Sequence, residues 1–162
     1  MISGCVMQLL EQILKQLADG EWYSGEALGE QFGVSRAAIW KQLQQLESGG
    51  LSLQSERGRG YRLSSPVDLL DVQSIRRELS PLAEQMLEDI ELHFRAESTN
   101  TRGVEIAEQK LHLSSSKAAV VLAEQQTAGR GRRGKTWVSP LAQNMYCSLV
   151  WRFNGGASAL SG

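Results

Sequence analysis

The first fifty residues repeat apolar side chains at helical spacing in three successive stretches. The first stretch has apolar residues three or four positions apart, at Val6, Leu9, Leu10, Ile13, Leu14 and Leu17. This spacing predicts an amphipathic helix that Asp19-Gly20 ends. Ser24 and Ser35 each precede a further stretch as N-caps, and Gly33 separates the two. Two short helices joined by a tight turn predict a helix-turn-helix, whose second helix enters a DNA major groove.

Period-two alternation follows and predicts a hairpin. Leu51–Gln54 and Tyr61–Leu63 alternate as short strands, and Glu56–Gly60 between them is basic and glycine-rich. This is the pattern of a winged helix-turn-helix, in which arginines of the wing lie along phosphates. The candidate DNA-binding residues are Ser35, Arg36, Trp40, Lys41, Arg57 and Arg59.

Two alternatives stay open for this segment. Trp40 either stacks against the sugar-phosphate wall or packs against the wing. The whole segment either binds DNA or is a helical protein–protein module with solvated charges. Because the segment also carries many carboxylates, we expect one copy to bind DNA weakly and a dimer to read two half-sites.

The pattern changes after the break at Ser64-Ser65-Pro66, so we place a domain boundary near residue 66, dividing 1–66 from 67–162. A short helix is predicted over 71–79, ended with the help of Pro81. Alternation predicts strands over 90–97 and 145–153. A helix is predicted over 101–113, after the first of these strands. The apolar run 118–123 is typical of a buried central strand. The chain is therefore of the α+β class, with a charged loop at a strand end.

Composition limits the kinds of partner, metal site and cellular compartment that the chain can have. The formal net charge is -1, so any nucleic-acid contact must come from a local patch. Cys5 and Cys147 are far apart, which indicates a reducing compartment and no disulfide framework. His93 and His112 have no ligand spacing, so we expect no zinc site. No apolar run is long enough to cross a bilayer and no signal peptide is visible, so we expect a cytoplasmic protein and no membrane partner.

The charged loop is Gly129–Gly134, where glycine and arginine alternate before Lys135. Glycine permits a positive φ and close approach to a bound group, and arginine grips carboxylate or phosphate with two hydrogen bonds. The loop also matches the dinucleotide fingerprint G-x-G-x-x-G. We reject that match because 135–140 is not a helix start, which the fingerprint requires. The loop predicts a site for an anionic ligand.

With these residues in view, the chain resembles the biotin–protein ligases. The stretch Ala123–Gly134, followed by Trp137, Ser139-Pro140 and Asn144–Tyr146, resembles the biotin-binding loop of that family. Glu97–Asn100 resembles its second signature at the expected distance upstream. Residues 24–29 and 35–39 are similar to the DNA-binding domain of the bifunctional bacterial member, which also represses the biotin operon.

The resemblance implies a winged helix-turn-helix followed by an incomplete α/β ligase domain similar to class II synthetases. It implies that biotin and Mg-ATP give biotinyl-5′-AMP and pyrophosphate, and that the biotinyl group passes to a lysine of a biotin carboxyl carrier protein. The implied biotin-binding residues are Ser98, Thr99, Asn100, Gln126, Arg130, Gly131 and Arg132, with Arg130 and Arg132 also catalytic. Arg132, Arg133 and Trp137 are implied to contact the adenylate.

The resemblance further implies regulation: biotinyl-5′-AMP acts as corepressor, and the loaded protein dimerises and binds operator DNA. The chain departs from the family at its end, because the sequence stops at Ser161-Gly162, before a Lys-Trp-Pro-Asn-Asp-like motif and a C-terminal β-barrel. We therefore expect the 162-residue chain alone to be inactive as a ligase. The alternative is a DNA-binding regulator whose second domain only senses a small anionic ligand.

Overall fold

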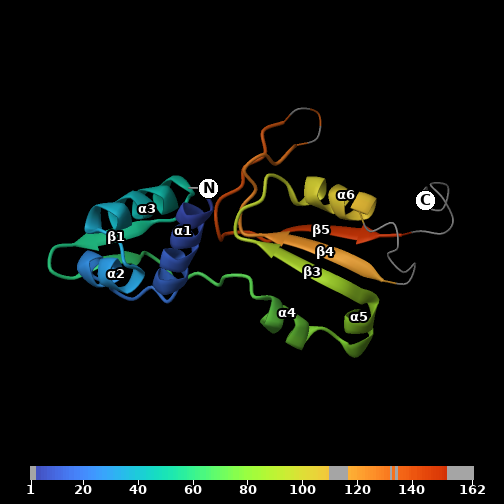
Figure 1. Ribbon diagram of the computed structural model, residues 1–162, viewed down its shortest axis with the longest axis horizontal. Helices are drawn as coiled ribbons and strands as arrows, with labels where there is room; N and C mark the ends of the chain where they lie inside the picture. The colour runs from blue at the N-terminus through green and yellow to red at the C-terminus, as the bar shows by residue number, and fades with distance from the viewer. Residues whose placement is uncertain (1–2, 110–116, 132, 134, 153–162) are drawn as a thin grey trace. The chain divides into compact units, whose positions relative to one another are not determined.

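The computed structural model describes residues 3–109, 117–131, 133 and 135–152. The chain divides into two units, Met1–Leu69 with Pro140–Gln143, and Leu70–Ser139 with Asn144–Gly162. The sequence assigned 67–69 and 140–143 to the second domain, so the first unit is discontinuous in sequence. Figure 1 shows both units and labels most of their helices and strands.

The first unit contains the predicted helices α1 (Ser3–Leu17), α2 (Gly25–Phe32) and α3 (Arg36–Ser48). The Ser24 and Ser35 hydroxyls accept hydrogen bonds from the backbone N–H groups of Ala27 and Ala38, as their cap positions predicted. Gly33 ends α2 with φ 65°. The helices bury a leucine-rich core formed by Leu10, Ile13, Leu14, Leu17, Leu28, Ile39, Leu43 and Leu46.

The predicted wing is the antiparallel hairpin of β1 (Leu53–Glu56) and β2 (Gly60–Leu63). Tyr61 exchanges two backbone hydrogen bonds with Tyr23, at 2.9 and 2.8 Å, which join β2 to the segment before α2. Gly60 has φ 106°, and a β-carbon there would overlap the Tyr23 carbonyl oxygen. Only glycine therefore fits this close approach.

Pro140–Gln143 completes the first unit beside the end of α3. The backbone N–H of Leu141 donates to the Gly49 carbonyl at 2.8 Å, and the Gln143 amide donates to the Gly50 carbonyl at 2.5 Å. The Leu141 side chain is fully buried. This short segment thus adds a core residue to the winged helix.

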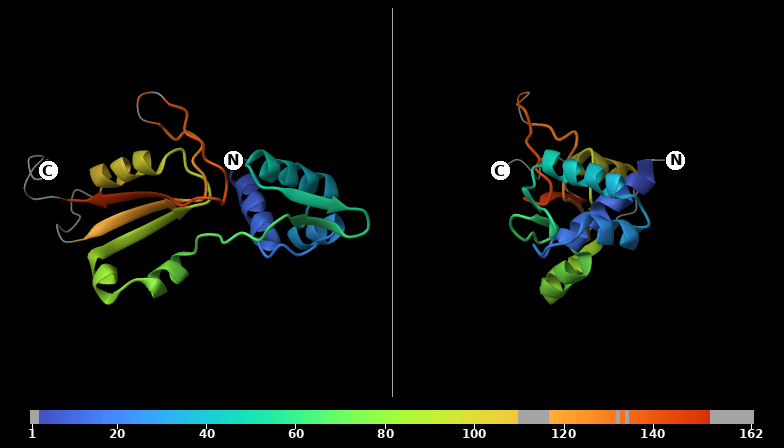
Figure 2. Two further views of the ribbon diagram at one scale, coloured as in Figure 1. Left: turned by 180° about the vertical axis from the view of Figure 1, so that it is seen from behind. Right: turned by 90° about the vertical axis from the view of Figure 1, so that its left-hand side faces the viewer.

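The second unit contains α4 (Val72–Glu78), α5 (Pro81–Met86), β3 (Leu87–His93), α6 (Thr99–Gln109), β4 (Ala118–Ala123) and β5 (Tyr146–Trp151). The sheet order is β3-β4-β5, with β3 parallel and β5 antiparallel to β4. α6 lies over one face of the sheet (Figure 2, left). There Ile106 packs against Ala119 and Val121.

The central strand matches its prediction, but its neighbours differ in detail. β3 begins at Leu87 and ends at His93, earlier than the predicted 90–97, since the chain bends after His93. Pro81 stands three residues beyond the end of α4 and begins α5, with Ser80 as N-cap. The last residues of the predicted 101–113 helix and Phe153 of the last predicted strand lie outside the described residues.

Candidate functional site

The site is built where backbone pairing between β3 and β4 continues past the ends of both strands. Ala96 donates to Gln125 at 3.0 Å, Thr127 donates to Ala96 at 2.8 Å, and Ala128 donates to Glu97 at 2.8 Å. This extended pairing sets Gln126 beside the start of α6. The two motifs that lie about thirty residues apart in sequence are therefore adjacent in space.

A cavity of about 360 Å³ opens at this point in the second unit. Six of its lining residues were predicted from the sequence: Ser98, Thr99, Asn100, Gln126, Arg130 and Trp137. The others come from the start of α6 and from β5 with its preceding residue: Thr101, Met145, Tyr146, Cys147 and Ser148. None of them was predicted as a site residue, although Met145 and Tyr146 belong to the stretch that resembles the biotin-binding loop. The sequence predicted the last strand but contained no signal for which of its ends meets the loop.

Hydroxyl and amide groups that line the cavity are hydrogen-bonded to one another. Gln126 Oε1 accepts from the Thr99 backbone N–H at 2.9 Å and from the Thr99 hydroxyl at 3.2 Å. The Ser148 hydroxyl lies 2.9 Å from Thr99 Oγ1. Ser98 accepts from the Thr101 backbone N–H at 3.4 Å and so acts as a cap for α6. Thr99 is 3% exposed, so its polar groups must find partners within the protein.

The glycine-arginine loop closes the cavity. A bridge pairs Arg130 with Thr136, and Arg130 Nη2 lies 3.5 Å from the Thr101 hydroxyl. A β-carbon on Gly129 would overlap the Trp137 indole, and one on Gly131 would overlap the Lys135 carbonyl. Neither glycine has a positive φ. Close packing inside the loop, and not a left-handed backbone, is therefore what requires glycine at both positions.

The remaining described residues of the loop, Gly131 and Arg133, lie outside the cavity lining. Arg132 lies outside the described residues. Arg133 is exposed with φ 58°. Ser139 anchors the far end of the loop, because its hydroxyl accepts from the Gln126 backbone N–H at 2.7 Å and its carbonyl accepts from the Gln125 amide at 3.1 Å.

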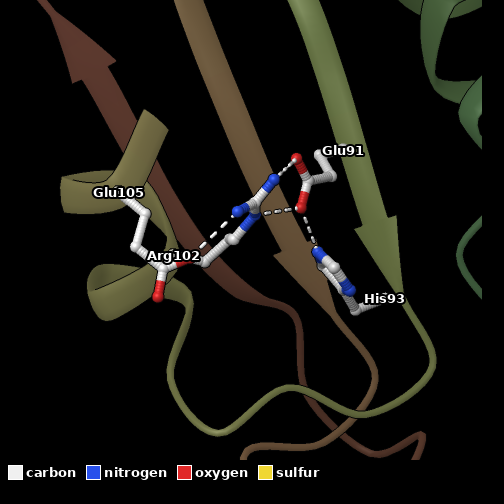
Figure 3. Close-up of polar contacts among 4 residues, drawn as sticks. All are labelled: Glu91, His93, Arg102 and Glu105. Atoms are coloured by element: carbon white, nitrogen blue, oxygen red, sulfur yellow. Dashed lines mark hydrogen bonds and ion pairs between the residues drawn. The ribbon is translucent and has the colours of Figure 1, made fainter. Parts of the chain in front are cut away.

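An ion-pair cluster joins β3 and α6 (Figure 3). Arg102 donates to both Glu91 oxygens, at 2.6 and 3.1 Å, and to Glu105 at 2.9 Å, and His93 also pairs with Glu91. The hydrogen bonds from Arg102, followed by that from His93, hold the pKa of the Glu91 carboxyl below its usual value. None of these residues lines the cavity. Because the ion pairs join α6 to β3, we assign the cluster the structural role of holding α6 on the sheet.

The candidate DNA-binding residues occupy α3 and the wing. Arg36 and Lys41 are exposed on α3, and Arg36 shares a hollow of about 450 Å³ with Arg57 of the wing. Glu26 and Glu56 line the same hollow. The Trp40 ring lies 6.1 Å from the Tyr61 ring, which is the packing against the wing that one of the two sequence interpretations expected. Ser35 is engaged as the N-cap of α3.

The wing arginines differ from one another. The Arg59 guanidinium lies 4.5 Å from the centre of the Trp22 ring and pairs with Glu56 at 3.1 Å. Arg62 lies 4.9 Å from the same ring and donates to Gln54. Arg57 stands exposed at the tip. Trp22 thus holds two of the three arginines against the protein.

The described residues contain neither a candidate metal site nor a candidate membrane-spanning helix. Between residues 3 and 152, with the gaps given above, no group of three or more histidine, cysteine, aspartate or glutamate side chains could hold a metal ion. Nor does any helix in that part of the chain have the length and apolar character needed to cross a membrane.

Comparison with known proteins gives two family matches. The helix-turn-helix domain model matches residues 9–62, and the biotin/lipoate A/B protein ligase family model matches residues 93–159. The bifunctional ligase/repressor BirA of Salmonella typhimurium is 41% identical over 150 residues, covering 93% of this chain and 43% of the relative. The Escherichia coli protein of the same name is 38% identical over 93% of this chain and 44% of the relative.

A relative with lower identity also matches most of the chain. The bifunctional ligase/repressor BirA of Bacillus subtilis is 31% identical over 83% of this chain and 40% of its own length. The chain therefore spans less than half the length of the curated relatives that it matches. Over that span, a helix-turn-helix domain precedes a ligase-family domain whose two signature motifs line one cavity, and the chain belongs to the family of bifunctional biotin ligase/repressors.

Proposed function

We propose that the protein containing this chain is a biotin–[carboxyl carrier protein] ligase that also represses its biotin operon. It forms biotinyl-5′-AMP from biotin and ATP and transfers the biotinyl group to a carrier lysine. The observation that supports this proposal is the single cavity lined by Ser98, Thr99, Gln126, Arg130 and Trp137. Hydroxyl and amide groups suit the cyclic urea of biotin, and a guanidinium suits its carboxylate.

In the proposed reaction, a biotin carboxylate oxygen attacks the α-phosphorus of ATP and pyrophosphate leaves. The carrier lysine amine then attacks the acyl carbon of the mixed anhydride, and AMP leaves with the electron pair. Arg130 orients the carboxylate and offsets charge that develops beside it. The roles of Arg132 as a second catalytic arginine and of Asn100 and Gly131 in biotin binding are carried over from the family signature.

Trp137 covers the bound adenylate and excludes water, which would otherwise hydrolyse the anhydride. We assign adenylate contacts to Arg132, Arg133 and Trp137. Mg²⁺ enters the proposed reaction as part of the Mg-ATP substrate.

The winged helix is the proposed operator-binding part, with Arg36 and Lys41 of α3 directed at the major groove and Arg57 at the phosphates. We propose biotinyl-5′-AMP as corepressor, a homodimer as the DNA-binding form, and the cytoplasm as its compartment. The exposed cations at the start of α3 and at the wing tip support this assignment.

Because the relatives are more than twice as long, ligand binding is the decisive measurement on this chain. We expect calorimetry to detect biotin and biotinyl-5′-AMP, and Arg130→Ala to weaken biotin binding about 10-fold or more, since a charge-assisted hydrogen bond is lost. Arg133→Ala is the matched control, because Arg133 does not line the cavity and should leave biotin affinity unchanged. Failure of the chain to bind either ligand would contradict the proposal.

A further inference from the structure

We infer that Ser148 is a positioning residue for ligand recognition: its hydroxyl orients that of Thr99, so that Gln126 presents its amide hydrogens to the ligand. This inference rests on the proposed function, because the ligand group in question is the urea carbonyl of biotin. Ser148 belongs to neither signature motif and comes from β5.

The donor and the acceptor of each hydrogen bond among Ser148, Thr99 and Gln126 follow from which atoms carry hydrogens. A backbone N–H only donates, so the Gln126 atom 2.9 Å from the Thr99 nitrogen must be the amide oxygen. The amide orientation is thus assigned by its partner. The Thr99 hydroxyl, 3.2 Å from the same oxygen, must also donate to it.

A hydroxyl has one proton, and Thr99 uses it on Gln126. The contact of 2.9 Å between Ser148 Oγ and Thr99 Oγ1 therefore has Ser148 as its donor. Ser148 therefore donates its hydroxyl hydrogen to Thr99, and Thr99 donates its own to Gln126. With its oxygen accepting twice, the Gln126 amide directs its NH₂ group away from Thr99, and Gln126 and Ser148 line the same cavity. An N–H donor there matches a urea carbonyl, which is a strong acceptor.

The approach of α6 to β5 makes this chain of contacts possible. Gly103 of α6 lies over β5, where a β-carbon would come 3.1 Å from Val150 Cγ2 and 3.8 Å from Ser148 Cβ. The missing side chain lets the first turn of the helix descend onto the strand. Thr99, one turn earlier, then reaches Ser148 across the sheet face.

The test is a double-mutant cycle in biotin affinity, measured by calorimetry on the full chain. Ser148→Ala should weaken biotin binding about three- to ten-fold, the range for one neutral hydrogen bond. Thr99→Val keeps the shape and removes the hydroxyl. In the Thr99→Val background Ser148→Ala should cause no further loss, because Ser148 acts only through Thr99.

Two further variants separate this role from general structure. Leu149→Ala changes the following residue of β5, which is 59% exposed and does not line the cavity, and should leave affinity unchanged. Ser148→Thr keeps the hydroxyl and should bind biotin within about two-fold of wild type, with thermal unfolding confirming the fold of each variant. Additive losses in the cycle, or wild-type affinity in Ser148→Ala, would overturn the inference. A wild-type chain that binds no biotin would instead overturn the proposed function.

Discussion

The Trp137 indole packs directly on the backbone of Gly129, so closely that the ring occupies the space a β-carbon would need. Trp137 also lines the ligand cavity, and its side chain is 46% exposed, so this contact is what positions the ring. The absence of a side chain at Gly129 thus lets the Trp137 ring take its position at the cavity.

Gly129→Ala should therefore displace the Trp137 ring and weaken binding of biotinyl-5′-AMP. We expect a loss of about 1–3 kcal/mol, the usual cost of overpacking, which is roughly 5- to 100-fold in affinity. Calorimetry measures the affinity. In a Trp137→Ala background the same substitution should cost little, and an equal loss there would show that the indole is not the reason.

The wing offers a second paired test. Gly60→Ala places a β-carbon on the Tyr23 carbonyl and should break the Tyr23–Tyr61 backbone pair, lowering the free energy of unfolding by about 2–4 kcal/mol. Gly58→Ala is the control, since Gly58 also has a positive φ, 85°, but open space around it. It should cost only about 1 kcal/mol. Urea unfolding followed by circular dichroism checks both, and equal costs would contradict the clash.

The pH dependence of stability should reveal the Glu91–Arg102 pair. Its hydrogen bonds to Arg102 lower the folded-state pKa of Glu91 below the usual 4.5. A lowered carboxyl pKa stabilises the fold above the unfolded-state pKa, and this contribution disappears as pH falls through the folded-state value. Glu91→Gln should therefore destabilise the chain by about 1 kcal/mol at pH 7, a figure reduced for solvent exposure, and the difference should shrink below pH 4.5.

Glu105→Gln serves as the control for this measurement. Glu105 pairs with the same arginine at 2.9 Å, but its side chain is 49% exposed. Urea unfolding at several pH values should show a loss of less than about 0.5 kcal/mol for it. A Glu91→Gln deficit that stays constant from pH 7 to pH 3 would show that packing, and not charge, is responsible.

The two wing arginines should differ in DNA binding. Arg57→Ala should weaken binding to an operator fragment and reduce the slope of log K against log salt by about one, as expected for one lost phosphate contact. Arg59→Ala should change that slope less, because its guanidinium already stacks on Trp22 and pairs with Glu56. Fluorescence anisotropy titrations at several salt concentrations measure the slopes. Equal slope changes would contradict the distinction.

Local signals allowed much of this fold to be predicted. Ser24, Gly33 and Ser35 delimit α2 and α3 as expected, because caps and breaks depend on neighbouring residues only. The apolar run 118–123 is β4. Both signature motifs were found because each is contiguous in sequence.

The parts that escaped prediction depend on contacts between distant residues. Ser148 joins the cavity through the packing of α6 on β5, and nothing in its neighbours marks that face. Leu141 is fully buried in the first unit although more than seventy residues separate it from the rest of that unit, and a single leucine after a proline has no periodicity to reveal this. Arg59 and Arg57 are equivalent in sequence, and the contacts of Arg59 with Trp22 and Glu56 distinguish them.

The membership of Pro140–Gln143 in the first unit also matters for how the DNA-binding part can be separated from the rest. A polypeptide cut after Leu69 lacks the leucine that plugs the space beside Gly49, and it leaves that carbonyl to solvent. The winged-helix unit is thus discontinuous in sequence, and a single cut cannot separate it from the rest of the chain without removing Leu141. A lineage that lost residues 1–69 would leave Leu141 without the core in which it is buried.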